Sequence, residues 1–264
     1  MDLGIKDRVA IVSGGSRGIG RETAREFLQA GAKVMTCSRH GDQVAKTCKE
    51  LAEQTGGEIH SIEADTSTQE GVDKLFKHTM DTYGTVDILF NNAGTMYSGR
   101  FAALTDEGLQ TQLDTKLFGF MRMMRVVWPV MREKRWGRIV SAIGGAGKEP
   151  DPYMFGSGMT NSALLNLTKS LSTEFAPYNV LVNAICPGWV KTALWERNLG
   201  NLQEELGVDN AEEATRLAQK KNSLGRFGRP EELANAVVFL CSERASYITG
   251  VSLNVDGGRL KGLW

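Results

Sequence analysis

The sequence predicts an α/β fold: one doubly wound parallel sheet of the Rossmann type, about seven strands wide, with helices on both faces. Two observations support this prediction. Short apolar runs alternate with longer amphipathic segments along the whole chain, and the first apolar run leads into a glycine-rich turn. The chain has 264 residues, which is enough to bury one substantial core, so we expect a single domain over residues 1–264.

The predicted strands are short segments rich in Val and Ile that end at Gly, Ser, Asn or Asp. They cover residues 8–14, 33–38, 58–65, 86–94, 137–144, 180–188 and 252–258. Helical patterns fill the intervals, at about 17–30, 41–55, 68–83, 105–133, 156–176 and 230–242. A strand that is repeatedly followed by a helix predicts parallel strands joined by crossovers.

One charged segment, residues 193–227, interrupts this alternation before the last helix. An insertion after the carboxyl end of a strand lies over the ligand crevice of such a sheet, so we predict a substrate lid. The alternative is a pair of helices that serve only the surface or an oligomer contact.

Composition excludes several classes of protein. Lysine plus arginine equals aspartate plus glutamate at 31 each, so no nucleic acid or other polyanion is expected as a partner. No apolar run is long enough for a membrane span, and the start lacks the apolar region of a signal peptide. The four cysteines have neither metal-ligand nor disulfide-framework spacing. We therefore expect a cytoplasmic protein with free thiols and no metal site.

The glycine-rich turn predicts a dinucleotide site. Glycines there allow a tight turn and the close approach of a pyrophosphate to the amino end of the first helix. The strand before the turn and the helix after it distinguish this motif from an ordinary glycine-rich loop. The expected contacts are Gly14, Ser16, Arg17, Gly18, Ile19 and Gly20.

The second strand ends at Ser38 and Arg39, with no carboxylate to bind a ribose 2′-hydroxyl. A hydroxyl and a guanidinium are the partners that a 2′-phosphate needs, and Arg17 offers a second positive charge. We therefore predict NADP(H) rather than NAD(H), although an arginine at a strand end can equally be a solvated surface residue.

Several motifs together resemble the short-chain dehydrogenase/reductase superfamily. They are "SGGSRGIG" at 13–20, Asp65-Thr66, "NNAG" at 91–94, "PGWVKT" at 187–192 and the C-terminal "RFGRPEELANAVVFLCSERASYITGVSLNVDGG". The resemblance implies a homotetramer or homodimer. It also implies that Asp65 and Thr66 flank the adenine and that Asn92 lines the centre of the cofactor. The nicotinamide end would contact Pro187, Gly188, Val190 and Thr192.

The catalytic set of that family, Asn, Ser, Tyr and Lys, does not carry over. The helix "NSALLNLTKSL" fixes the register and places Asn161 at the lysine position and Ser157 at the tyrosine position. Gly144 then stands at the serine position and Lys116 at the asparagine position. An alkyl hydroxyl is a much weaker acid than a phenol, so standard ketone reduction is not expected. An iminium ion needs no simultaneous proton donor, and hydride delivery to C=N remains possible.

Five residues are candidates for the altered site. Lys116 could hold the cofactor ribose, Asp151 could stabilise a cationic substrate, Tyr153 could orient it, and Trp189 and Trp195 could form an apolar wall. Each has a plain alternative. Lys116 could face solvent or extend from the core with its charged end at the surface. "PDPY" at 150–153 could be an ordinary turn with a solvated Asp151, and both tryptophans could be packing residues.

The missing set together with "PDPY" resembles the fungal indole-alkaloid reductases of the malbrancheamide and paraherquamide type. That resemblance implies an NADPH-dependent reductase/Diels–Alderase in alkaloid biosynthesis, acting on a prenylated-indole cyclic imine. Two other classes remain open at this point. One is a non-redox cyclase or isomerase that uses NADP as part of the pocket wall, and the other is a catalytically silent NADP-binding protein.

Overall fold

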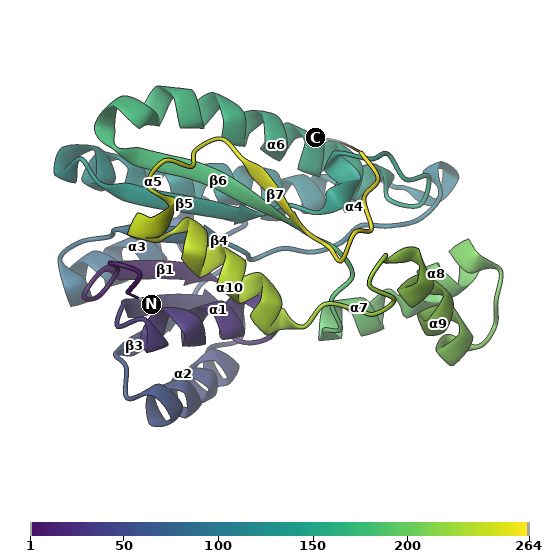
Figure 1. Ribbon diagram of the computed structural model, residues 1–264, viewed down its shortest axis with the longest axis horizontal. Helices are drawn as coiled ribbons and strands as arrows, with labels where there is room; N and C mark the ends of the chain where they lie inside the picture. Colours follow the sequence, from purple (N-terminus) through teal and green to yellow (C-terminus); the bar gives the residue numbers. More distant parts are fainter. Residues whose placement is uncertain (1, 263–264) are drawn as a thin grey trace.

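The computed structural model describes residues 2–262, without the side chains of Leu194 and Arg197. Seven parallel strands form one sheet in the order β3-β2-β1-β4-β5-β6-β7 (Figure 1). The strands are β1 Val9–Ser13, β2 Lys33–Ser38, β3 Ile59–Glu63, β4 Ile88–Asn91, β5 Gly137–Ala142, β6 Val180–Pro187 and β7 Ser252–Val255. Each lies inside a segment predicted as a strand, and the doubly wound fold class is confirmed.

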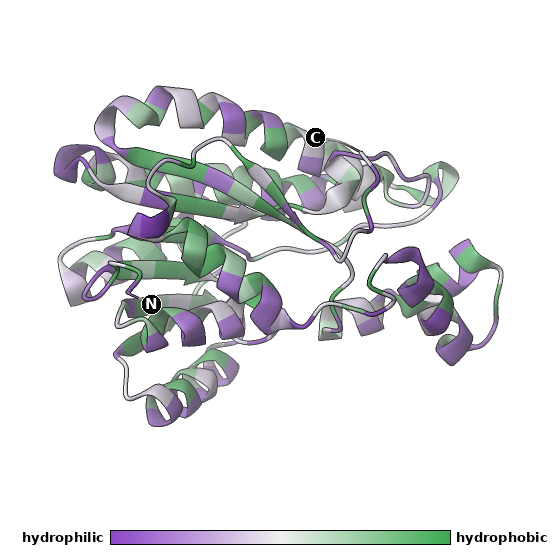
Figure 2. Ribbon diagram, viewed as in Figure 1, coloured by the Kyte–Doolittle hydropathy of each residue, from purple (hydrophilic) through white to green (hydrophobic). Residues whose placement is uncertain are grey.

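The strands separate two apolar cores because their side chains alternate between the faces of the sheet. In β1, Ala10 and Val12 face one core and Ile11 faces the other. One face is covered by α1 Gly18–Gln29, α2 Gly41–Thr55 and α10 Pro230–Leu240. The other is covered by α3 Gln69–Tyr83, α5 Gly119–Lys134 and α6 Phe155–Phe175. Figure 2 shows the apolar strands lying between these helices.

The predicted helix 105–133 is not a regular α-helix throughout. It consists of α4 Asp106–Gln112, a π-helical segment at Leu113–Phe118 and then α5. A π-helical turn holds an extra residue, and the 3.6-residue pattern of the sequence does not reveal it. At the junction, Gly119 packs on the carbonyl oxygen of Thr66, where a Cβ would lie only 2.8 Å away. The π segment contains Lys116 and thereby sets where that side chain lies.

The insertion at 193–227 forms α7 Ala193–Arg197, α8 Leu199–Leu206 and α9 Ala211–Lys221. In Figure 1 these short helices stand apart from the layers of the sheet, beyond the carboxyl end of β6. They enclose a small apolar cluster of their own, which includes Leu202, Ala214, Ala218 and Phe227. Whether this segment moves as a lid stays a prediction.

The expectation of free thiols agrees with the structure. All four cysteines are free and buried. Within residues 2–262, no helix is long and apolar enough to cross a membrane, and no group of His, Cys, Asp or Glu side chains could hold a metal ion.

Candidate active site

A cavity of about 540 Å³ lies where the strand order reverses, at the carboxyl ends of β4, β5 and β6. This is the position at which open parallel sheets bind their ligands. Most of the predicted residues near the nicotinamide end and the substrate line this cavity. They are Ile19, Asn92, Lys116, Asp151, Tyr153, Pro187, Gly188, Trp189, Val190, Thr192 and Trp195.

The glycine-rich turn has the backbone that a pyrophosphate requires. Gly14 and Gly18 have φ angles of +73° and +57°, a region that side chains with a Cβ rarely occupy. A Cβ at Gly20 would lie 2.3 Å from the Gly14 carbonyl oxygen. The amide of Asn92 closes the turn by donating hydrogen bonds to the Ser13 and Gly14 carbonyls, both at 3.1 Å. The positive φ angles and the close packing at Gly20 require glycine and produce the tight turn that a dinucleotide phosphate site needs.

The residues predicted to hold the adenosine half lie outside the cavity, at the neighbouring ends of β1, β2 and β3. Arg17 and Arg39 are exposed, and Ser38 accepts a hydrogen bond from the His40 amide at 3.2 Å. Asp65 caps its own turn by accepting the Ser67 amide at 2.9 Å, while Thr66 is buried beside Gly119. The exposed guanidiniums leave room for a phosphate at this edge.

Lys116 lies in the cavity wall close to Gly94, where a Cβ on the glycine would be 3.8 Å from the lysine Cδ. Burial of the ammonium group lowers the pKa of Lys116 to about 8. The side chain lines the pocket, is mostly charged at pH 7 and loses its charge as the pH rises through about 8.

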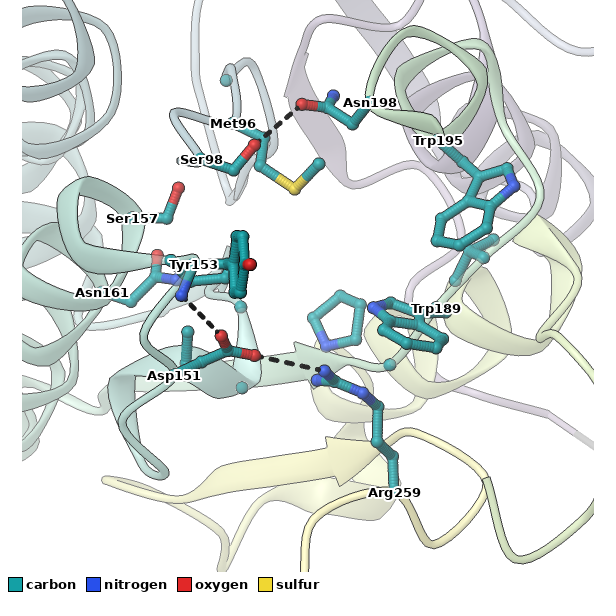
Figure 3. Close-up of a pocket in the computed structure, with 18 of the residues that line it drawn as sticks. Met96, Ser98, Asp151, Tyr153, Ser157, Asn161, Trp189, Trp195, Asn198 and Arg259 are labelled. Carbon is teal, nitrogen blue, oxygen red and sulfur yellow. Dashed lines mark hydrogen bonds and ion pairs between the residues drawn. The ribbon is translucent and has the colours of Figure 1, made fainter. Parts of the chain in front are cut away.

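Asp151 belongs to a turn and also lines the cavity, while its role toward a cationic substrate stays a prediction. One carboxylate oxygen accepts the Tyr153 amide at 2.9 Å, and the Asp151 carbonyl accepts the Met154 amide at 2.9 Å, so 151–154 is indeed a turn. The other carboxylate oxygen faces the cavity and lies 3.8 Å from a guanidinium nitrogen of Arg259 (Figure 3). The turn thus orients a carboxylate into the pocket.

Tyr153 is 8% exposed and lines the same cavity. The guanidinium of Arg100 lies over its ring at 4.3 Å, and its carbonyl accepts the Gly99 amide at 2.7 Å. These contacts fix the ring as part of the wall (Figure 3).

The first turns of α6 present Ser157 and Asn161 to the cavity, four residues apart and both buried. The Ser157 hydroxyl accepts the Tyr97 amide at 3.1 Å and is 3.2 Å from the Tyr97 carbonyl, to which it donates. This hydroxyl is therefore committed to the backbone of the segment after β4. Asn161 fills the space beside Gly144, where a Cβ would lie 2.8 Å from its amide nitrogen. Its buried side-chain oxygen has no hydrogen-bond partner within the described residues.

Trp189 and Trp195 do form an aromatic wall, and they also pack. Their ring centroids are 5.4 Å apart, and each ring contacts Phe227, at 6.3 Å and 4.6 Å respectively. Both line the cavity on the side opposite Tyr153 (Figure 3). The packing interpretation is confirmed, and a role of the two rings as a wall for a substrate stays a prediction.

Several lining residues were not predicted from the sequence. Ser98 links the segment after β4 to the insertion, since its hydroxyl donates to Asn198 at 3.2 Å and accepts from Asn201 at 2.8 Å. Arg259 and Leu260 come from the chain after β7. The rule that all carboxyl ends of parallel strands meet at one edge could have identified this last segment, because β7 ends there too.

Comparison with known proteins agrees with this geometry. Residues 14–259 match the family model described as Enoyl-(Acyl carrier protein) reductase. The chain is 33% identical over 258 residues to the 3-oxoacyl-(acyl-carrier-protein) reductase FabG of Aquifex aeolicus, covering 98% of this chain and 99% of that protein.

Solved structures give the same result. L-sorbose reductase from Gluconobacter frateurii, complexed with NADPH and L-sorbose, superposes with a TM-score of 0.92 at 34% identity, covering 100% of both chains. A variant of the actinorhodin polyketide ketoreductase with NADPH superposes with a TM-score of 0.93 at 31% identity, covering 97% of this chain and 98% of that chain. With its sheet order, its glycine-rich turn and these relatives, the chain belongs to the short-chain dehydrogenase/reductase superfamily.

Proposed function

We propose that this protein is an NADPH-dependent reductase of cyclic iminium ions or similarly activated C=N substrates. A bound NADPH would supply the hydride. NADPH as cofactor is supported by the exposed Arg17 and Arg39 near the ends of β1 and β2, and by the relatives that bind it. The residues that would hold it are those of the glycine-rich turn, the ends of β2 and β3, Asn92, Lys116 and the segment 187–192.

The observation that carries the proposal is a cation site lined by Asp151 and Trp189, in which the Arg259 guanidinium lies 3.8 Å from the carboxylate and 4.3 Å from the ring centroid of the indole. A carboxylate opposite an aromatic face suits a flat cation. The proposed substrate carries its positive charge before hydride arrives, and the product amine is neutral. No proton has to be delivered in the same step, so the protein needs only to orient the cation and exclude water.

The pairing of Ser157 with the Tyr97 backbone supports the same proposal. In our register Ser157 stands where the family keeps its proton-donating tyrosine, and Asn161 stands where it keeps its lysine. A serine whose hydroxyl already bonds to the backbone is a poor acid for an alkoxide. Ketone reduction by the usual family route would therefore be slow in this protein.

The aromatic wall extends the proposal to the substrate class. Trp189, Trp195 and Tyr153 would enclose a large aromatic ligand, in keeping with the resemblance to fungal indole-alkaloid reductases. We propose a prenylated-indole cyclic iminium whose C=N is conjugated with further double bonds. Hydride addition to this cation leaves a neutral azadiene, and the azadiene and the prenyl alkene would form two new C–C bonds in a Diels–Alder cycloaddition guided by the same enclosure. Product analysis by mass spectrometry and NMR would identify the bridged diazaoctane.

The test of the reductase proposal is NADPH oxidation with matched substrates. N-methylpyrrolinium should be reduced, and cyclopentanone of similar size should not. A cyclase that uses NADP only as pocket wall would form product with NADP⁺ and without net oxidation. Equal rates with the ketone, or no hydride transfer to a broad panel of iminium ions, would contradict the proposal.

A further inference from the structure

The segment after β7 folds back over the cavity and is held by its backbone. Asp256 accepts the Gly258 amide at 2.9 Å and the Leu260 amide at 2.8 Å. Further along, the amides of Lys261 and Gly262 both donate to Glu149 at 2.5 Å. These bonds fix the path of residues 256–262 against the loop that contains Asp151. Arg259 lies between the two anchors, so its side chain can move without releasing the segment.

The guanidinium of Arg259 occupies a site built for a cation. It lies 4.3 Å from the ring centroid of Trp189 and 3.8 Å from a carboxylate oxygen of Asp151. The side chains of Arg259 and Asp151 are 21% and 22% exposed, so both partners of the ion pair are mostly buried. Figure 3 shows the guanidinium between the carboxylate and the indole, in the mouth of the cavity. A carboxylate opposite an aromatic face binds a flat, weakly hydrated cation, and here the protein supplies that cation itself.

The contact is one that a ligand can replace. At 3.8 Å the pair is an ion pair without a hydrogen bond, and among residues 2–262 no hydrogen bond to this carboxylate oxygen is recorded. Asp151 itself stays in position when Arg259 leaves, because the Tyr153 amide holds its other oxygen at 2.9 Å. The site is therefore preorganised with or without the guanidinium.

We propose that Arg259 is a specificity-determining residue that acts as an internal competitor for the cation site formed by Asp151 and Trp189. This inference rests on the proposed function, since it concerns the site assigned there to the iminium. A ligand enters only if it replaces the guanidinium, and for that it needs both a delocalised or alkylated positive charge and an apolar body. Neutral ketones lack the positive charge and small hydrated cations lack the apolar body, so neither replaces the Arg259 guanidinium.

The test measures binding without turnover, so that it does not depend on hydride transfer. N,N-dimethylpyrrolidinium is permanently charged and cannot be reduced. Its dissociation constant is measured by isothermal titration calorimetry with the full chain saturated with NADP⁺. We expect Arg259→Gln to bind it about three-fold to ten-fold more tightly than the wild type, because the competitor and its like charge are removed. The neutral N-methylpyrrolidinone should show no gain.

Lys261→Gln is the matched control. It removes the same unit charge from the same segment, but the Lys261 ammonium bonds to Ser223 at 3.0 Å and to the Gly258 carbonyl at 2.6 Å, away from Asp151. Its affinity for the probe should stay at the wild-type value. A second comparison uses Asp151→Asn as background. Adding Arg259→Gln there should give a smaller gain than in the wild type, because the like charge is still removed but no carboxylate remains to compete for.

Equal or weaker binding by Arg259→Gln overturns the inference, and so does an equal gain in Lys261→Gln, which would indicate a general charge effect. Failure of the proposed function looks different. If no iminium is ever reduced while Arg259→Gln still tightens binding of the probe, the cation site stands and the reductase assignment does not.

Discussion

Replacement of Asp151 by Asn separates two possible roles for this residue. The substitution keeps the shape and the acceptor for the Tyr153 amide but removes the negative charge. Hydride transfer neutralises an iminium, so the positive charge has already decreased in the transition state. A carboxylate that only stabilises the cation therefore favours the bound substrate at least as much as the transition state.

The size of the effect follows from the partial burial of the site. Exposed ion pairs contribute about 1 kcal/mol or less, whereas breaking a fully buried pair costs roughly 3–5 kcal/mol. The Asp151 side chain is 22% exposed and lies between these limits. An intermediate value of about 2 kcal/mol corresponds to about thirty-fold in KM for N-methylpyrrolinium when Asp151→Asn is compared in an Arg259→Gln background, where no guanidinium competes for the carboxylate. With Arg259 present the rise in KM should be smaller, because the substitution also removes the partner of the competitor. The kcat should be unchanged or slightly higher.

Steady-state NADPH oxidation with N-methylpyrrolinium is the assay, with Tyr153→Phe as the neighbouring control. That variant keeps the ring beneath Arg100 and should retain kcat, since no proton donor is needed. A large fall in kcat for Asp151→Asn at unchanged KM would refute the reasoning and assign a proton-transfer role to Asp151. A comparable fall in Tyr153→Phe would identify the phenol as the missing acid.

The remaining predictions concern the cofactor site and Lys116. Gly20→Ala should abolish NADPH binding, because a Cβ would lie 2.3 Å from the Gly14 carbonyl oxygen. Fluorescence titration measures the affinity for NADPH. A circular dichroism spectrum of the variant tests whether it is still folded. Arg39→Ala should weaken NADPH binding about ten-fold or more, because a charge-assisted hydrogen bond contributes about 1.5–3 kcal/mol. The affinity for NADH should be unchanged. A wild-type preference for NADH would contradict the assignment of NADPH. The Lys116 ammonium is lost as pH rises through its pKa of about 8, which removes a like charge from the pocket. In the absence of dinucleotide, N,N-dimethylpyrrolidinium should therefore bind more tightly above pH 8 than below it. Lys116→Met should abolish this pH dependence. Weaker binding at high pH would contradict the placement of Lys116 in the pocket.

The sequence predicted the sheet well because local patterns encode it. Val and Ile runs that end at polar or glycine residues identified all seven strands. The π-helical segment before α5 was not predicted, since one extra residue in a turn does not change the hydrophobic pattern enough to be recognised.

The site was predicted in part. Residues next to a motif, such as Asp151, Tyr153, Trp189 and Lys116, line one cavity as expected. Arg259 was missed because the chain after β7 has no periodic pattern, and its position depends on long-range bonds from Glu149. The double role of Asp151, with one oxygen in the turn and one in the pocket, likewise depends on a residue more than a hundred positions away.

The central claim is hydride delivery to a cation without a dedicated proton donor. A single-turnover reaction with NADPH that carries deuterium at the transferable position of the nicotinamide tests it most directly. We predict that N-methylpyrrolinium yields deuterated N-methylpyrrolidine while cyclopentanone under the same conditions yields no deuterated alcohol. Deuterium transfer to the ketone at an equal or greater rate would contradict the account.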